Sequence, residues 1–444
     1  MVTDMTKGSP VRILWKFSIP LLVSMMFQQL YNIADSVIAG KFVGEEALAA
    51  VGASYPIVMI FMAVAVGSNI GSSVIISQSF GAKKYGVMKT AVNTAVVSIA
   101  VLSLILTAAG LLYSKSMLLI LKTQENIMSA AEEYLNVYTA GLFFLFLYNI
   151  STGVFTALGD SKTPLYFLIA SSLGNIALDL VFVINFKMGV AGVAWATFIA
   201  QGIAALLAFF VLMSRLSKIE SGEEKPRLFD TNLLRKTALV AVPSILQQSF
   251  VSVGNLFIQA LINGFGASAV AGYSAAIKLN TFVITSISTL AGGLSSYTAQ
   301  NIGAGKLDRI PKGTRVGMTM TAVVAVPFTI IYAFFGGRAL SLFLNNESAG
   351  AAAVGISFLR IVSPFYFIVG IKIMMDSVLR GAGAMLTFTI STFADLLLRV
   401  VLAFIMSDFV GTDGIWWSWP VGWCVSTVLS VVFYFCGTWR KKAI

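Results

Sequence analysis

Residues 78–86 read QSFGAKKYG and residues 300–308 read QNIGAGKLD, so one glycine-containing turn occurs twice, 222 positions apart. The same offset, or 223 before residue 44, relates further residues along the whole chain: Pro20/Pro243, Asn32/Asn255, Gly44/Gly266, Gly71/Gly293, Gly159/Gly381, Gly192/Gly414 and Trp195/Trp417. Periods of roughly 20–50 residues indicate solenoids, whereas a repeat of half the chain predicts two lobes built on one plan.

The composition is that of a membrane protein. Hydrophobic residues make up 57% of the chain and charged residues 11%, against about 25% charged in soluble domains. Twelve apolar stretches reach the bilayer-spanning length, and their lack of strict alternation favours helices over barrel strands. The predicted spans are 11–40, 46–79, 87–113, 126–158, 162–185, 190–213, 231–263, 268–301, 314–336, 349–380, 384–407 and 413–437.

The distribution of positive charge predicts the orientation. With a cytoplasmic N-terminus, cytoplasmic segments would hold 21 of the 30 Lys and Arg residues. That bias follows the positive-inside rule, so we expect a multi-pass protein of the cell membrane with both termini cytoplasmic. The net charge of +11 is then explained by contact with the lipid bilayer, and nucleic acid is not expected as a partner.

Six spans per half give both halves the same orientation. The sequence therefore predicts an all-α membrane protein of twelve transmembrane helices, in two six-helix lobes related by a pseudo-two-fold along the membrane normal. Residues 1–213 form the predicted N-terminal lobe and residues 231–444 the C-terminal lobe. The polar segment 214–230 is the predicted cytoplasmic linker.

Several kinds of chemistry are absent from the sequence. Histidine does not occur, and the two cysteines, Cys424 and Cys436, both lie in the last span. No nucleophile–base constellation and no partner-binding domain can be recognised, which argues against an intramembrane enzyme or an assembly scaffold. We expect no enzymatic activity, no cofactor and no metal other than Na⁺.

Span 1 carries the best candidate for ion handling. Gln28, Tyr31, Asn32 and Asp35 lie on one helical face, and a charge inside the bilayer costs about 2.5–3.5 kcal/mol. Asp35 is therefore the predicted coupling carboxylate, with the other three residues as a supporting polar stripe. The alternative is that Asp35 only meets water at the outer rim.

Span 5 carries Asn175 and Asp179 four residues apart, and span 6 carries Thr197. Carboxylate, amide and hydroxyl oxygens suit a hard monovalent cation. These residues are candidate cation ligands; the alternative is a hydrogen-bond cluster between helices.

The second half does not repeat these acids. Asn255 and Gln259 are uncharged counterparts in span 7, and Lys278 shows no partner in the sequence. The pairs Lys372/Asp376 and Asp395/Arg399 have i,i+4 spacing, so each could neutralise itself as a structural ion pair or contact substrate. The second-lobe candidates are Asn255, Gln259, Lys278, Lys372, Asp376, Asp395 and Arg399.

Pro20 and Pro243 each remove a backbone hydrogen bond early in a span, so we expect helix bends there, either static or hinge-like. Six methionines could line a pliable apolar cavity or could instead face lipid or belong to the core: Met25, Met26, Met59, Met62, Met374 and Met375. Gly67 and Gly71 have the spacing of a close helix contact.

Together, the two six-span halves, the proline before the span 1 aspartate, the Asn175–Asp179 pair, the Gln-x-x-Gly-Ala turns and the Gly159-Asp160 turn resemble the multidrug and toxic compound extrusion (MATE) family. The resemblance covers essentially the whole chain. It implies an antiporter in which inward Na⁺ or H⁺ movement drives export of organic, often cationic, compounds. It also implies that Asp35, Asn175, Asp179 and Thr197 form the first-lobe cation site of one branch.

The second-lobe acids of another branch have no clear match, because span 7 has Asn255 and Gln259, and Asp376 lies beside Lys372. The chain is expected to function as a monomer with small organic substrates and a monovalent cation as partners. The main rival is a flippase for lipid-linked oligosaccharides from the same broad superfamily. Neither the coupling ion nor the substrate follows from the sequence.

Overall fold

A computed structural model of the chain describes residues 3–38, 42–43, 45–221, 225–343 and 349–440. The first half contains α1 Pro10–Ile38, α2 Glu45–Gly81, α3 Tyr85–Ile120, α4 Glu125–Ala140, α5 Leu142–Ala157, α6 Lys162–Leu180, the π-helical η2 Val181–Asn185 and α7 Gly189–Ser217. The second half contains α8 Thr231–Asn263, α9 Ala267–Gly303, α10 Arg309–Leu340, α11 Ala349–Val362, η3 Ser363–Phe365, α12 Tyr366–Gly381, α13 Met385–Val410, α14 Thr412–Phe435 and η4 Thr438–Arg440.

The predicted all-α class is confirmed, since the described residues form helices and no strand. Eleven helical stretches within them are long and apolar enough to cross a membrane. The remaining predicted span, 126–158, corresponds to α4 and α5, a pair that bends by 46° at Gly141. Span 10 is interrupted by η3, where Pro364 cannot donate a backbone hydrogen bond.

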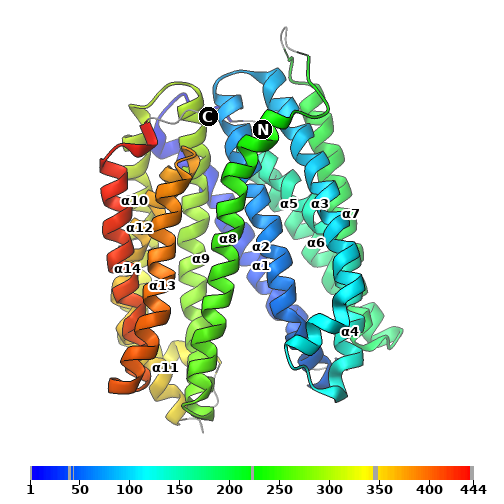
Figure 1. Cartoon of the computed structure of the whole chain (residues 1–444), viewed down its shortest axis with the longest axis vertical. Helices are drawn as coiled ribbons and strands as arrows, with labels where there is room; N and C mark the ends of the chain where they lie inside the picture. Colours follow the sequence, from blue (N-terminus) through cyan, green and yellow to red (C-terminus); the bar gives the residue numbers. More distant parts are fainter. Residues whose placement is uncertain (1–2, 39–41, 44, 222–224, 344–348, 441–444) are drawn as a thin grey trace. The chain divides into compact units, whose positions relative to one another are not determined.

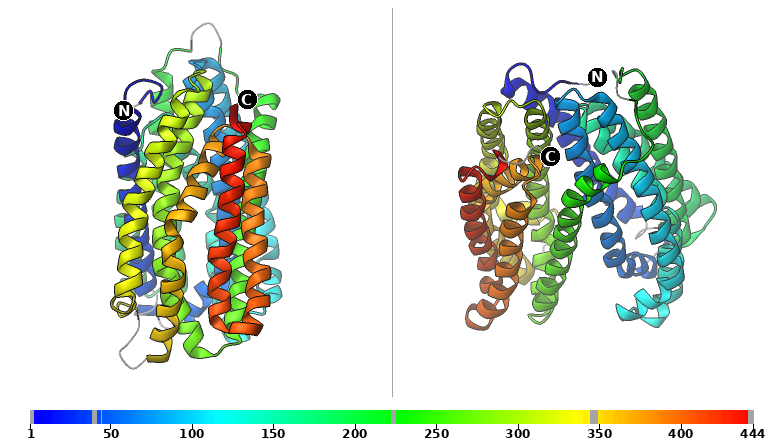
Figure 2. Two further views of the ribbon diagram at one scale, coloured as in Figure 1. Left: turned by 90° about the vertical axis from the view of Figure 1, so that its left-hand side faces the viewer. Right: turned by 45° about the horizontal axis from the view of Figure 1, so that its top comes forward.

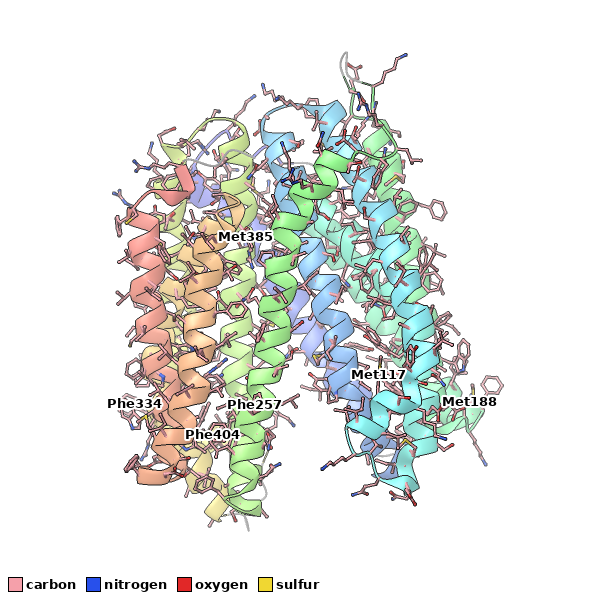
Figure 3. The ribbon with its side chains drawn as sticks, in the orientation of Figure 1. Met117, Met188, Phe257, Phe334, Met385 and Phe404 are labelled. Carbon is pink, nitrogen blue, oxygen red and sulfur yellow. The ribbon has the colours of Figure 1, made fainter. Side chains whose placement is uncertain are left out.

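Large apolar side chains cover the outside of the helices. Phe334 of α10 is 77% exposed and Phe409 of α13 is 83% exposed. Others can be located in Figure 3, among them Phe257 of α8 and Phe404 of α13. Such a surface is stable against lipid tails rather than water, as expected of membrane-spanning helices.

The contacts divide the chain into two compact units. Unit 1 comprises Met1–Met5 and Ile19–Ser249, and unit 2 comprises Thr6–Ser18 and Phe250–Ile444. Within each unit the helices run side by side, α2 to α7 in unit 1 and α9 to α14 in unit 2 (Figures 1 and 2). The divisions fall inside α1 and α8, so the lobe boundaries at residues 213 and 231 stay a prediction.

Glycines explain why the first part of α8 belongs to unit 1. A Cβ atom on Gly71 of α2 would lie 2.6 Å from the Cβ of Ala241, and one on Gly67 would lie 2.6 Å from the backbone nitrogen of Ile245. The predicted close contact of Gly67 and Gly71 is confirmed, and α8 is its partner. In unit 2 the repeated Gly293 of α9 lies equally close to α1, since a Cβ atom on it would lie 2.7 Å from the Ser18 hydroxyl oxygen.

Both α1 and α8 continue as helices through Pro20 and Pro243. The hydroxyl of Ser24 donates to the Pro20 carbonyl at 2.9 Å, and the hydroxyl of Ser244 donates to the Val240 carbonyl at 2.9 Å. Bends at the two prolines stay a prediction.

The turn before α6 is fixed by Asp160. Its carboxylate accepts the backbone N–H groups of Lys162 and Thr163, both at 3.1 Å, and pairs with Arg215 at the end of α7. Burial raises the pKa of Asp160, but the hydrogen bonds from Thr163 and Arg215 outweigh it, so the pKa is lowered overall. Gly159 supplies the positive φ of 78° that the turn requires. Asp160 thereby ties α6 to α7.

The linker between α7 and α8 is held against α3 rather than free in solution. Thr90 and Thr94 of α3 accept the backbone N–H groups of Arg227 and Asp230, both at 3.0 Å, and the Asn93 amide donates to the Arg227 carbonyl at 2.9 Å. Asp230 also caps the N-terminus of α8. The sequence predicted a linker here without these contacts.

The glycine contact gives a direct test. Gly71→Ala should lower the free energy of unfolding by about 1–3 kcal/mol, because the added methyl overlaps Ala241. Gly52→Ala is the matched control in the same helix, since nothing lies within 4 Å of its Cβ position. Thermal unfolding in detergent measures both variants, and equal midpoints would contradict the packing described for α2 and α8.

Candidate functional site

Unit 1 contains an open cavity of about 650 Å³ between α1, α2 and α4 to α7. Its described lining contains hydroxyl, amide, phenol, thioether and aliphatic groups but no charged side chain. The polar and aromatic lining residues are Ser24, Gln28, Tyr31, Asn32, Tyr55, Asn69, Tyr134, Tyr138, Tyr148, Asn149, Thr152, Thr156, Ser171, Ser172, Asn175, Thr197 and Gln201.

The polar stripe of α1 lies on this cavity. Gln28, Tyr31 and Asn32 all belong to its lining. Asp35 follows Asn32 by three residues within α1, but its side chain lies outside the described part of the chain. Its role as coupling carboxylate therefore stays a prediction.

The predicted group from spans 5 and 6 is brought together by α6 and α7. In the amide orientation that satisfies its neighbours, Asn175 donates to the Asp179 carboxylate at 2.8 Å and accepts from the backbone N–H and hydroxyl of Thr197 at 3.0 and 3.2 Å. Asn175 and Thr197 line the cavity, whereas Asp179 is fully buried. A carboxylate, an amide and a hydroxyl thus converge beside the cavity, which is compatible with either a cation site or a hydrogen-bond cluster.

Sequence reasoning missed the contribution of α4 and α5. Tyr134 and Tyr138 lie one turn apart on α4 with ring centroids 6.3 Å apart, and both line the cavity together with Tyr148 of α5. The i,i+4 spacing of Tyr134 and Tyr138 was the available signal. Of the six methionines, Met59 and Met62 belong to the lining. The other four do not: Met25, Met374 and Met375 are buried and Met26 is exposed.

Helix α5 approaches α2 closely at this cavity. A Cβ atom on Gly153 would lie 1.6 Å from the Asn69 side-chain oxygen, which in turn accepts the Ser73 hydroxyl at 2.9 Å. Because Gly153 has no side chain, the Asn69 side chain can occupy this space at the cavity.

Asn255 and Gln259 lie one turn apart on α8, and Lys278 lies on α9. Asn255 is exposed on α8, and the Gln259 amide donates to Asn263 at 2.9 Å. The Lys278 ammonium lies 5.6 Å from the centre of the Phe343 ring.

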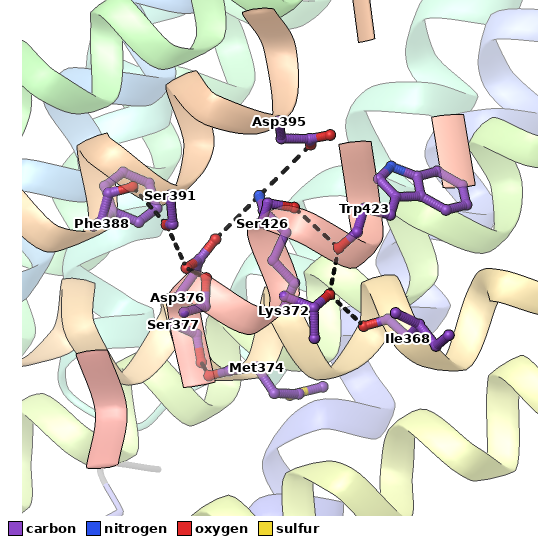
Figure 4. Close-up of polar contacts among 12 residues, drawn as sticks. Ile368, Lys372, Met374, Asp376, Ser377, Phe388, Ser391, Asp395, Trp423 and Ser426 are labelled. Atoms are coloured by element: carbon purple, nitrogen blue, oxygen red, sulfur yellow. Dashed lines mark hydrogen bonds and ion pairs between the residues drawn. The ribbon is translucent and has the colours of Figure 1, made fainter. Parts of the chain in front are cut away.

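The four charged residues of spans 10 and 11 are buried in unit 2, and Figure 4 shows three of them, Lys372, Asp376 and Asp395. Lys372 pairs with Asp376 at 3.1 Å, as its spacing allowed. The suggested Asp395/Arg399 pair is not among the ion pairs of the described residues: Lys372 lies 3.8 Å from Asp395, and Arg399 lies 4.4 Å from the centre of the Trp419 ring. Neighbouring helices supplied partners that spacing along α13 could not reveal.

The chain is similar to known proteins over almost its full length. The MatE family model matches residues 20–181 and again residues 243–405, so the internal repeat is recognised in both halves. The probable multidrug resistance protein YpnP of Bacillus subtilis (strain 168) is 29% identical over 442 residues, which cover 99% of this chain and 98% of YpnP.

Two further similarities agree with this. The multidrug export protein MepA of Staphylococcus aureus (strain NCTC 8325 / PS 47) is 23% identical over 415 residues, 92% of this chain and 90% of MepA. Among solved structures, the outward-facing conformation of a multidrug resistance MATE family transporter of the MOP superfamily matches with a TM-score of 0.90 at 23% identity, covering 99% of both chains. At that identity, the structural match establishes the fold.

The Asn175 contacts can be tested by substitution. Asn175→Ala should lower the free energy of unfolding by about 1–3 kcal/mol, because buried Asp179 loses an amide donor. Ser171→Ala is a matched control, since Ser171 lines the cavity from the same helix and makes none of these three contacts. A similar unfolding midpoint for the two variants would show that the Asn175 contacts contribute nothing to stability.

Proposed function

Because the chain belongs to the MatE family of multidrug efflux transporters, whose members are not enzymes, we propose that it is a cation-coupled antiporter. It exports organic, cationic compounds in exchange for Na⁺ or H⁺, by alternating access between its two lobes. Small organic molecules, the coupling cation and the lipid bilayer are its partners, and it works as a monomer without a cofactor.

The observation that carries this proposal is the cavity of unit 1. Its volume of about 650 Å³ falls within the range of roughly 300–1,000 Å³ found for small-molecule sites. Five tyrosines line it: Tyr31, Tyr55, Tyr134, Tyr138 and Tyr148. Phenol rings attract organic cations by about 0.5–2 kcal/mol each.

Coupling is assigned to Asp35 and Asp179. Asp35 follows the lining residue Asn32 by one helical turn, and Asp179 lies behind the lining residue Asn175. Their oxygens suit Na⁺ or a proton equally. If a cationic substrate and the coupling ion compete for the same negative charge, each lowers the affinity for the other, as antiport requires.

The orientation follows the charge distribution. The basic segments before α1, between α2 and α3, and around the linker face the cytoplasm, so both termini are cytoplasmic in the cell membrane. The Na⁺ or H⁺ gradient across that membrane supplies the free energy for export.

The flippase alternative is less well supported. A lipid-linked oligosaccharide presents phosphates, which need uncompensated cationic side chains. Buried Lys372 already lies beside Asp376 and Asp395, and Lys278 lies over Phe343. The relatives described above are named as multidrug resistance or export proteins.

Vesicles with purified protein test the coupling. An imposed Na⁺ gradient at clamped pH, or a pH gradient without Na⁺, should drive ethidium transport, and Asp35→Asn should reduce the driven rate at least about tenfold. Asp408→Asn, which removes an exposed acid of α13, is the control and should leave the rate unchanged. Driven transport that persists in Asp35→Asn would contradict the coupling assignment.

A further inference from the structure

The group of charges in unit 2 is arranged around Lys372 of α12. Its ammonium lies 3.1 Å from one oxygen of Asp376 and 3.8 Å from one oxygen of Asp395, so it bridges α12 and α13 (Figure 4). The side chains of all three residues are exposed by no more than 10%. An ion bridge between two carboxylates is thus enclosed within the membrane-spanning part of the unit.

The carboxylate of Asp376 is held in place from two other helices. Its second oxygen accepts the hydroxyl of Ser391 in α13 at 2.9 Å and the hydroxyl of Ser430 in α14 at 2.6 Å. A carboxylate oriented in this way keeps its position when its cation is exchanged, because hydrogen bonds and not the cation fix it.

Asp395 is incompletely satisfied. Its other carboxylate oxygen is buried and accepts no hydrogen bond within the described chain. A Cβ atom on Gly422 of α14 would lie 2.9 Å from that same oxygen, so the glycine lets α14 pack closely against Asp395. The carboxylate therefore keeps one buried oxygen without a donor within the described residues.

Lys372 is the cation that contacts both carboxylates. Arg399 contributes a positive charge, but its guanidinium lies against the Trp419 ring, and its Nε is also unsatisfied within the described residues. Arg380, one turn after Asp376 on α12, interacts with that carboxylate at longer range and is not among its ion pairs within the described residues. Without Lys372, neither carboxylate would have an ion-pair partner among the described residues, which is costly in the membrane.

We propose that Asp376 and Asp395 build a monovalent-cation site in unit 2, and that the Lys372 ammonium occupies it as a tethered cation. Carboxylate oxygens bind Na⁺ and K⁺ as readily as they bind an ammonium, which is itself a compact point charge. A tethered cation has a high effective concentration at its site, so free ions are excluded while Lys372 is charged. Removing the lysine opens the site to Na⁺ or K⁺.

This inference goes beyond the export function and holds whatever compound is exported. It explains why the candidate coupling carboxylates lie in the first lobe alone: in the second lobe the Lys372 ammonium permanently occupies the cation site, so that lobe binds no coupling ion.

The test uses ion-dependent stability of the full-length protein. All variants are made in an Asp35→Asn background, and their thermal unfolding midpoints are measured in NaCl, KCl and choline chloride at equal ionic strength. In Lys372→Met the midpoint should rise by at least about 3 °C between choline chloride and about 100 mM Na⁺ or K⁺. The parent should show no such rise.

Two controls separate a site from a general salt effect. Lys372→Arg keeps a tethered cation and should behave like the parent. The double variant Lys372→Met/Asp395→Asn removes one carboxylate together with the ammonium and so keeps the net charge of the parent; it should fold without an added cation and lose the ion response.

Each contrary result is decisive. A Lys372→Met protein that responds to Na⁺ and K⁺ no more than the parent overturns the proposal, as does one stabilised by low pH alone. An equal ion response in the double variant places the bound ion elsewhere. If Lys372→Met folds in none of the salts while the double variant folds, the two carboxylates merely repel and form no cation site.

Discussion

The bilayer does not hydrate a buried charge, and this constraint governs where the chain can act. An enclosed carboxylate must be hydrogen-bonded, paired with a cation or used to bind one. The two units meet this demand differently. In unit 1, Asp179 accepts a hydrogen bond from the Asn175 amide beside a cavity whose described lining is neutral. In unit 2, Asp376 and Asp395 lie against the ammonium of Lys372. The same physical requirement is therefore met by a hydrogen bond in the first unit and by an ion bridge in the second.

The duplication preserves the scaffold while the chemistry diverges. Gly71 lets α8 approach α2, and its repeat Gly293 lets α1 approach α9, so each half keeps one close helix contact at the same position. These contacts require only that the glycine has no side chain. That condition still holds when the surrounding residues change. The polar lining of the unit 1 cavity and the ion bridge of unit 2 depend instead on particular side chains. That is where the two copies have become different.

Much of the fold could be predicted from the composition and from the helical period of the sequence. A membrane span needs about 20 apolar residues, and an α-helix has about 3.6 residues per turn. The twelve predicted spans match helices of the described chain, and Gln28, Tyr31 and Asn32 share the cavity that their common face suggested. The sequence does not reveal which helix faces which. Spacing along α13 suggested that Arg399 neutralises Asp395, but Lys372 comes from α12 and Trp419 from α14. Tyr134 and Tyr138 were missed for the same reason, as was the attachment of the linker to Thr90 and Thr94 of α3.

The central claim is that substrate and coupling ion compete for negative charge at the first-lobe cavity. Equilibrium binding of ethidium to the purified wild-type protein, followed by fluorescence over a matrix of Na⁺ concentration and pH, measures this directly. Competition predicts that the half-saturating ethidium concentration rises about tenfold for each tenfold increase of the coupling ion above its own dissociation constant. An ethidium affinity that is independent of both Na⁺ and pH would contradict the account.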